Sequence, residues 1–191
     1  MDMFNMGRVP PVTFGSGRVA KLPSLVRDIG GSPVLIVADA ILADLGVTDR
    51  VAQDLAAKGI ASEVAADVAG EPKDTLVDAL CEKARAAGAK TVIGIGGGAA
   101  MDAAKLVAAI APSGTPALEF ALAAKPMPSD GLPAIAVPTT AGTGSEVTRT
   151  AVVSRADGWK NWYWGEELMF DQAVLDPELT LSLPTHITAW T

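Results

Sequence analysis

Two segments of this chain each run from a short apolar stretch into a turn built of very small residues. The first is residues 91–105, TVIGIGGGAAMDAAK, and the second is residues 133–148, PAIAVPTTAGTGSEVT. Each apolar stretch predicts a buried strand, and the alanine-rich sequence after the first turn favours a helix. Glycines let backbone N–H groups approach an anion, and the start of a helix adds positive potential. The two turns therefore predict a nucleotide-binding site.

Strand and helix patterns alternate along most of the chain. After an extended segment at 9–14, we predict strands at 34–38, 62–66, 92–95 and 135–137, and helices at 19–29, 48–58, 75–87 and 99–111. Residues 112–133 are predicted to be irregular. This alternation is typical of βαβ units, and predicts an α/β fold with a Rossmann-like parallel sheet and flanking helices. Right-handed crossovers bring the strand ends to one edge, where ligands bind.

Composition excludes several classes of partner. The net charge of −7 argues against nucleic acid, whose phosphates need basic patches. No apolar run reaches the roughly 18 residues of a membrane helix, and residues 1–6 do not resemble a signal peptide. The single cysteine, Cys81, excludes a disulfide within the chain and is expected to be a core thiol. We expect a soluble cytoplasmic protein with no membrane partner.

The first turn and the residue before it each allow two interpretations. Residues 94–99 fit the pattern G-x-G-x-x-G/A, which is weak alone and lacks the acidic residue expected about 20 positions later. The alternative is a tight turn that lets a helix pack on a sheet. Asp39 ends an earlier strand, where a carboxylate can accept hydrogen bonds from ribose hydroxyls and repel a 2′-phosphate, which favours NAD. Its alternative role is an N-cap.

The second turn is the more specific signal. Thr139, Thr140, Thr143 and Ser145 lie close together around two glycines, a density that suits a diphosphate better than an ordinary surface loop. Two lysines, Lys105 and Lys160, are candidate point charges for phosphate. A cluster of tryptophans at 159–164 favours an interface over a ring-stacking site.

These motifs resemble those of the iron-containing (group III) alcohol dehydrogenases. Residues 138–148 match that family's most recognisable motif without a gap, and residues 96–105 resemble its GGGSxxDxAK stretch. The turn at 14–17 and the segments 174–180 and 183–184 also resemble family segments, in the same order. The similarity extends over essentially the whole chain. Dehydroquinate synthase and glycerol-1-phosphate dehydrogenase have a similar architecture, but the second turn fits the alcohol dehydrogenases better.

The resemblance implies a dehydroquinate synthase-like N-terminal domain at 1–180, followed at 181–191 by the truncated start of a helical metal-binding domain. It implies these cofactor contacts: Asp39 to the adenosine ribose; Gly97, Gly98 and Ala99 to the pyrophosphate; Thr139, Thr140 and Thr143 along the nucleotide; Lys160 and Leu179 near the nicotinamide; and Asp102 within the first motif. It implies no catalytic residue and no metal ligand in this chain.

Three departures from the family pattern affect these expectations. Ala99 stands where the family usually has serine, and Glu71 stands where an asparagine is common. The chain also ends before the segment that supplies the first metal ligands, and its one histidine, His186, matches no ligand position. We therefore expect the cofactor half of an NAD-dependent alcohol dehydrogenase or aldehyde reductase. Fe²⁺ or Zn²⁺ is expected only in the full-length family member.

The partners implied are a small alcohol or aldehyde and further copies of the chain, since a homo-oligomer is expected. Taken alone, the chain is expected to bind NAD weakly and to be inactive, because the metal ligands are missing. The alternative interpretation is a non-catalytic nucleotide-binding or dimerisation module derived from a truncated dehydrogenase.

Overall fold

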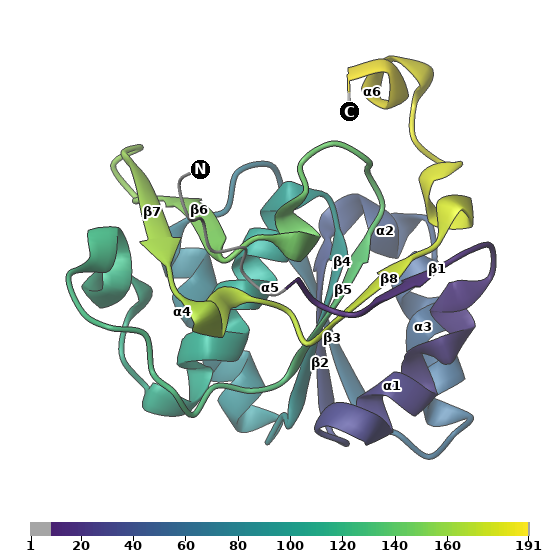
Figure 1. Cartoon of the computed structure of the whole chain (residues 1–191), viewed down its shortest axis with the longest axis horizontal. Helices are drawn as coiled ribbons and strands as arrows, with labels where there is room; N and C mark the ends of the chain where they lie inside the picture. Colours follow the sequence, from purple (N-terminus) through teal and green to yellow (C-terminus); the bar gives the residue numbers. More distant parts are fainter. Residues whose placement is uncertain (1–8, 191) are drawn as a thin grey trace, which may run out of the picture.

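One parallel sheet of six strands organises the computed structural model, which describes residues 9–190 (Figure 1). The strand order is β1-β8-β5-β4-β2-β3, and every neighbouring pair is parallel. The strands are β1 (Val12–Phe14), β2 (Val34–Asp39), β3 (Ser62–Val68), β4 (Thr91–Gly96), β5 (Ala134–Pro138) and β8 (Gln172–Leu175). The predicted Rossmann-like parallel sheet is confirmed.

Helices cover both faces of this sheet (Figure 1). The helices α1 (Leu22–Ile29) and α3 (Val47–Ala56) lie on one face, and α4 (Asp74–Ala86) and α5 (Gly98–Ile110) lie on the other. Alternate residues of β2 enter the two cores: Ile36 packs with α1 and α3, whereas Leu35 and Val37 pack with α4 and α5. The strands are apolar throughout because both of their faces are buried.

The helix α5 packs closely against the sheet at Gly94. A Cβ on Gly94 of β4 would lie 2.7 Å from the Cβ of Ala104 in α5, so this strand position accepts no side chain. The alanine-rich sequence of α5 therefore serves two purposes: it favours a helix, and its small side chains let the helix axis lie near the strands. Cys81 of α4 is buried on the same side, which confirms the expected core thiol.

The structure differs from the sequence-based expectation in several elements. The predicted helix at 19–29 is a 3₁₀ turn η1 (Arg18–Lys21) followed by α1, whose Pro23 occupies a first-turn position that proline tolerates. The short helix α2 (Ala40–Asp44) and the strand β8 were not predicted. The segment 112–133, predicted to be irregular, contains the 3₁₀ turns η2 (Ala111–Ser113) and η3 (Ala117–Ala123).

A two-stranded antiparallel hairpin of β6 (Thr150–Ser154) and β7 (Lys160–Trp164) stands beside the main sheet and was also not predicted. It lies over α5 and η3. Asn161 and Tyr163 of β7 are buried, whereas Trp162 and Trp164 are 44% and 48% exposed on the opposite face. An interface at these tryptophans stays a prediction.

The remaining elements are η4 (Ser145–Val147), η5 (Glu166–Leu168), η6 (Pro177–Thr180) and α6 (Thr185–Trp190). Figure 1 shows α6 projecting away from the body of the molecule. Within 9–190, no single helix is both long and apolar enough to cross a membrane, although Gly98–Ser113 and Ala117–Ala123 meet that test as a pair bent by 116°. Residues 1–8, which include those of the signal-peptide prediction, lie outside the described range, as does residue 191.

Candidate functional site

The strand order of the sheet reverses direction between β2 and β4. From β2 the chain continues to β3 on one side, and it then crosses to β4 on the other side. Open α/β sheets bind ligands in the crevice outside the carboxyl ends of two such strands. Asp39 ends β2 and Gly96 ends β4, so both predicted features lie at this switch point.

Asp39 contacts the first turn directly. Its Oδ2 accepts a hydrogen bond from the backbone N–H of Gly97 at 2.8 Å. Asp39 precedes α2 at the N-cap position, but its side chain accepts no capping hydrogen bond from that helix. Burial raises the pKa of this carboxyl above its ordinary value, and the Gly97 hydrogen bond opposes that rise. Among the described residues no donor contacts Oδ1, which leaves this oxygen for a ligand hydroxyl.

The first turn leaves no room for a side chain at Gly96. Gly96 has a φ of +145°, and a Cβ on it would lie 2.2 Å from Asp39 Oδ2. Gly97 is the N-cap of α5, and Gly98 begins the helix. The first N–H groups of a helix have no partner within the helix, so the turn presents donors and the positive end of the helix dipole at the crevice.

The second turn lies against the first. The N–H of Thr139 donates to the Gly96 carbonyl at 2.9 Å. Side-chain atoms of Thr140 lie 3.6–3.7 Å from the position of a Cβ on Gly97, and Thr143 Cγ2 lies 3.0 Å from that of a Cβ on Gly98. The structure thus brings together Asp39, Gly97, Gly98, Ala99 and the three threonines.

One hydroxyl in this group has no partner within the described part of the chain. Thr140 Oγ1 is buried and makes no hydrogen bond. Buried polar atoms are nearly always paired, so an exception in a native structure calls for an explanation, such as a bound water, an ion or strain. The orphaned hydroxyl and the open turn together fit a phosphate-containing ligand.

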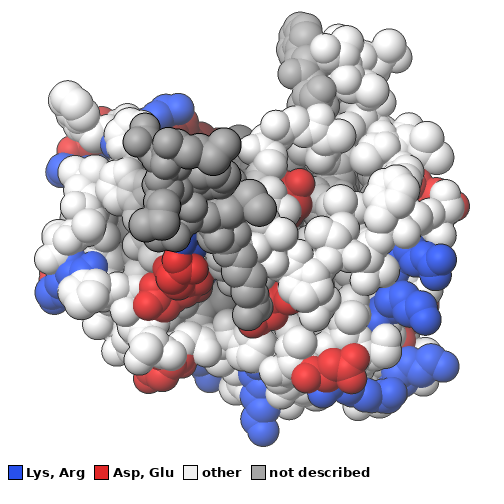
Figure 2. Space-filling view, viewed as in Figure 1, with Lys and Arg blue, Asp and Glu red and all other residues white. Residues whose placement is uncertain are grey.

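Thr140 also lines a cavity of about 240 Å³ at the carboxyl edge. The cavity lies between the second turn, Phe14 and the segment 175–180. Its lining residues are Phe14, Pro138, Thr140, Ala141, Glu146, Leu175, Asp176, Pro177 and Thr180. Figure 2 shows Lys and Arg gathered at the edge formed by α1 and α3, while the rim above the strands is mostly uncharged on the face in view. Phosphate at this rim would therefore be bound by N–H and hydroxyl groups.

Asp102 and Lys105 lie on α5 beneath the second turn. Asp102 Oδ1 accepts from the Ser145 hydroxyl, and Oδ2 accepts from the Val152 N–H at 2.9 Å. The carboxylate therefore joins α5 to η4 and β6, and a direct cofactor contact by Asp102 stays a prediction. Lys105 is buried and its Nζ contacts residues of the same loop.

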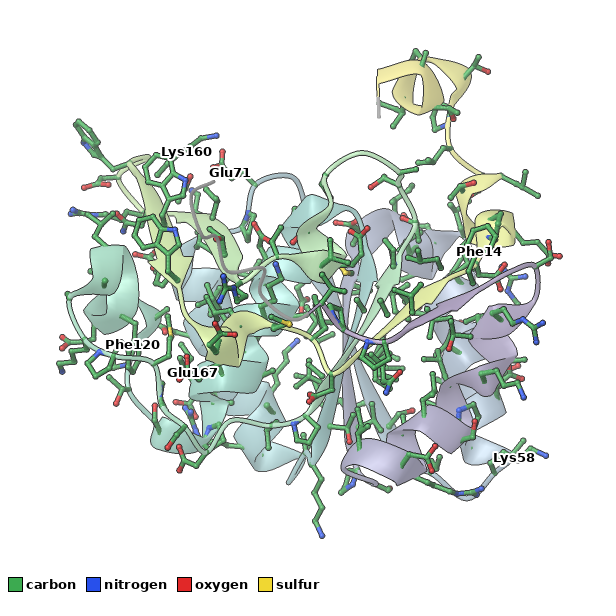
Figure 3. The ribbon with its side chains drawn as sticks, in the orientation of Figure 1. Phe14, Lys58, Glu71, Phe120, Lys160 and Glu167 are labelled. Carbon is green, nitrogen blue, oxygen red and sulfur yellow. The ribbon has the colours of Figure 1, made fainter. Side chains whose placement is uncertain are left out.

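Lys160 and Leu179 lie apart from the two turns. Lys160 Nζ is 3.1 Å from Glu71 Oε1, and Figure 3 shows the two side chains next to each other at the upper rim. Hydrogen bonds from Ser154 and then from Lys160 lower the pKa of Glu71 below its ordinary value. Leu179 lines a different cavity, of about 430 Å³, with residues of α3 such as Val51. Roles for Lys160 and Leu179 near a nicotinamide stay predictions.

Sequence reasoning missed Asp176, a buried carboxylate that shapes the rim. Its Oδ1 accepts from the N–H groups of Gly17 and Glu178, and its Oδ2 accepts from that of Val19. It joins the opening turn of the chain to the end of β8. An aspartate directly before a proline that begins a helical turn is a recognisable capping signal, and η6 follows it here.

The described residues do not fit a catalytic metal. Within 9–190 no group of three or more His, Cys, Asp or Glu side chains is placed to hold a metal ion. The site that the chain does contain is made of backbone amides, hydroxyls and one carboxylate.

Comparisons with known proteins show which chains this one is similar to. Residues 10–177 match a family model described as "Iron-containing alcohol dehydrogenase". A long-chain-alcohol dehydrogenase of Geobacillus thermodenitrificans is 35% identical over 185 residues, which are 95% of this chain and 47% of that protein. A sulfoacetaldehyde reductase of Bilophila wadsworthia is 33% identical and matches 96% of this chain and 47% of its own length.

Solved structures extend the likeness to three dimensions. A sulfoacetaldehyde reductase from Bifidobacterium kashiwanohense, solved in complex with NAD⁺, superposes with a TM-score of 0.93 at 33% identity, covering 99% of this chain and 50% of that one. An NADH-dependent butanol dehydrogenase from Thermotoga maritima has a TM-score of 0.91 at 26% identity, covering 100% and 48%. The chain spans about half the length of these relatives.

Proposed function

Because this chain belongs to the iron-containing alcohol dehydrogenase family, we propose that it is the NAD-binding α/β part of an NAD-dependent alcohol dehydrogenase or aldehyde reductase. In this proposal residues 1–180 form the cofactor domain and residues 181–191 begin a helical domain. The observation that carries it is the meeting of Asp39, the Gly97 turn and the unpaired Thr140 hydroxyl at the switch point of the sheet.

Each group in the crevice has a proposed contact. Asp39 Oδ1 accepts from the hydroxyls of the adenosine ribose, and its negative charge disfavours the 2′-phosphate of NADP. The N–H groups of Gly98 and Ala99 donate to the diphosphate at the start of α5. Thr139, Thr140 and Thr143 line the nucleotide from the opposite side. Support for these contacts comes from the adjacency of the two turns.

The proposed contacts at the nicotinamide end of the cofactor rest on the family resemblance. Lys160 and Leu179 are proposed to lie there, and Lys160 would then leave its ion pair with Glu71. Bound NAD supplies a hydride acceptor for an alcohol, or NADH a hydride donor for an aldehyde. The Fe²⁺ or Zn²⁺ of the family is not held by the described residues of this chain, so we propose no turnover by the chain alone. We propose a soluble, cytoplasmic protein.

The second candidate function is a non-catalytic dimerisation module. The exposed face of β7 favours it, since Trp162 and Trp164 are 44% and 48% exposed beside Trp159 at 73%. A homo-oligomer is compatible with either function. The two differ in cofactor binding, because a module that only dimerises has no need of Asp39.

Titration calorimetry with NADH tests the proposal. We expect saturable binding by the wild-type chain and a Kd raised about tenfold in Asp39→Ala, because the ribose would lose hydrogen bonds to a charged acceptor. The same substitution should reduce the preference for NADH over NADPH. Asp28→Ala, at an exposed aspartate of α1, is the matched control and should bind as the wild type does. Absence of NADH binding by the wild-type chain would overturn the proposal.

A further inference from the structure

Lys105 is a buried charge that the proposed cofactor contacts do not use. Only 1% of the residue is exposed, although it lies in the middle of the apolar helix α5. Its Nζ lies 3.0 Å from Ser145 Oγ, 2.9 Å from Thr148 Oγ1 and 2.8 Å from the Thr150 carbonyl oxygen. Ser145 and Thr148 belong to the second turn, and Thr150 begins β6 directly after it.

Three oxygens accept hydrogen bonds from Lys105 Nζ, which equals the number of N–H donors on a charged lysine. An ammonium group has three N–H donors, whereas the neutral amine has two. The Ser145 hydroxyl accepts a hydrogen bond from Lys105 and donates one to Asp102 Oδ1. The serine therefore links the ammonium to a carboxylate. Asp102 Oδ1 itself is 3.7 Å from Nζ, and the ring of Phe170 lies 5.8 Å from it at the centroid. Every lysine N–H therefore has a partner inside the protein.

We propose that Lys105 is a positioning residue for the dinucleotide: in its charged form it holds the loop 139–148 against α5 in the shape that receives the diphosphate. The inference rests on the proposed NAD site. Lys105 acts through the loop and not as a phosphate ligand, because its three donors are already used. The beginning of the loop is fixed by the Thr139–Gly96 hydrogen bond, and Lys105 fixes its other end.

The surroundings make this lysine sensitive to pH. Burial lowers its pKa from 10.5 to about 8, and the charges of Asp102 and Glu146 oppose that shift. On its other side Lys105 lines a cavity of about 220 Å³, which it shares with three further acids, Glu166, Glu167 and Asp171. Below pH 8 the ammonium satisfies all three oxygens. As pH rises through 8 the amine loses one donor, so the loop loosens and NADH affinity should fall.

The test measures NADH affinity by fluorescence at pH 7 and pH 9.5, together with amide hydrogen exchange of residues 139–148 without nucleotide. For the wild type we expect affinity about fivefold weaker at pH 9.5, the equivalent of one hydrogen bond. Lys105→Met should bind about tenfold more weakly at pH 7, lose this pH dependence and show faster exchange in the loop. Lys90→Met, at an exposed lysine before β4, is the matched control and should change neither measurement.

A milder variant covers the case in which Lys105→Met does not fold. Thr148→Val keeps the shape of an exposed side chain and removes one oxygen from Nζ. We expect NADH affinity about threefold weaker at pH 7, and its loss with pH to begin at a lower pH, because an ammonium with fewer acceptors deprotonates more easily.

The outcomes separate this inference from the proposed function. If NADH binds to the wild type and Lys105→Met with the same affinity and pH profile, the positioning role is overturned while the NAD site stands. If Lys105→Met does not fold, a flat wild-type pH profile with unchanged loop exchange in Thr148→Val overturns it instead. If no variant binds NADH, the proposed function fails, and the exchange rates alone decide whether Lys105 fixes the loop.

Discussion

The two turns at the carboxyl edge look alike in sequence but are fixed by different physical means. The first is fixed at Gly96 by close packing, because this residue has a positive φ and no space for a Cβ beside Asp39. The second, at 139–148, is fixed by side-chain hydrogen bonds that meet at Lys105 and Asp102. The steric constraint at Gly96 does not change with pH, whereas the hydrogen bonds of Lys105 depend on its protonation.

This difference predicts which kind of substitution disrupts each turn. A packed glycine turn fails when an atom is added, and a hydrogen-bonded loop fails when a partner or a charge is removed. The two turns contact each other through Thr139, Thr140 and Thr143, so damage to either should reach the same crevice. Of three substitutions, given in decreasing order of expected effect, the first two test this comparison and the third tests the role of Lys160 outside the two turns.

Gly96→Ala should have the largest effect. The added methyl would lie 2.2 Å from Asp39 Oδ2 and 2.8 Å from the Ala100 Cβ, at a φ of +145°. We expect a loss of about 3 kcal/mol in the free energy of unfolding, from strain and overpacking together, and NADH binding weakened more than about tenfold. Urea denaturation and calorimetry measure the two effects.

The control for that substitution is Gly59→Ala, which shares a positive φ of +73° but has no atom within 4 Å of the new Cβ. It should lose only about 1 kcal/mol, from backbone strain, and should leave NADH binding unchanged. Equal losses in the two variants would show that φ alone, and not the contact with Asp39, fixes the first turn.

Asp102→Asn should have an intermediate effect. It keeps the side-chain shape but removes the carboxylate charge near buried Lys105 and weakens the acceptor for Ser145. We expect a loss of about 2 kcal/mol in the free energy of unfolding, because the buried ammonium loses its compensating charge. The pKa of Lys105 should fall further, so NADH binding should weaken at a lower pH than in the wild type.

Asp67→Asn provides the comparison for Asp102→Asn, since Asp67 pairs with Lys83 at the surface, where both side chains are more than 40% exposed. A change within about 0.5 kcal/mol is expected there, as for other exposed ion pairs. The second turn would not depend on buried charge if Asp102→Asn were as mild as Asp67→Asn.

Glu71→Gln should have the smallest effect. Glu71 holds Lys160 in an exposed ion pair, so the amide should free Lys160 for the cofactor and strengthen NADH binding about twofold at low salt. The gain should disappear at high salt, because screening weakens the pair in the wild type. The pKa of Glu71 is lowered, so the pair persists as pH falls through the ordinary range of a glutamate and is lost only below it. A gain that persists in high salt would contradict this explanation.

The sequence predicted the sheet and the crevice because both depend on local signals. Apolar stretches such as 34–38 and 92–95, each followed by Asp39 or a glycine turn, indicate parallel strands and the edge at which they end. The strand β8 was not predicted because it has only four residues, which are too few to show a periodic pattern, and the acidic and proline residues 176–178 follow it directly. The hairpin was not predicted because β7 alternates in an unusual way. Its buried positions are Asn161 and Tyr163, whereas its large apolar tryptophans are the exposed ones.

The residues of the candidate site also divide into those with a local sequence signal and those without one. Gly97 and Thr140 were identified because small and hydroxyl-bearing residues in a turn are themselves the signal. The role of Lys105 was not, because its partners Thr148 and Thr150 lie more than 40 positions away along the chain, and a sequence does not show which way a lysine points. Asp176 was missed for the same reason: it contacts Gly17, 159 residues away.

The position of β1 at the sheet edge determines the order in which the chain can complete its fold. This strand is the first of the described sheet along the chain, yet its neighbour is β8, which is the last strand of that sheet. During synthesis Val12–Phe14 therefore has no partner in this sheet until residues 172–175 have left the ribosome. Closing so long a loop slows folding, so we expect the edge at β1 to form last, after the centre of the sheet has formed around β2 and β4.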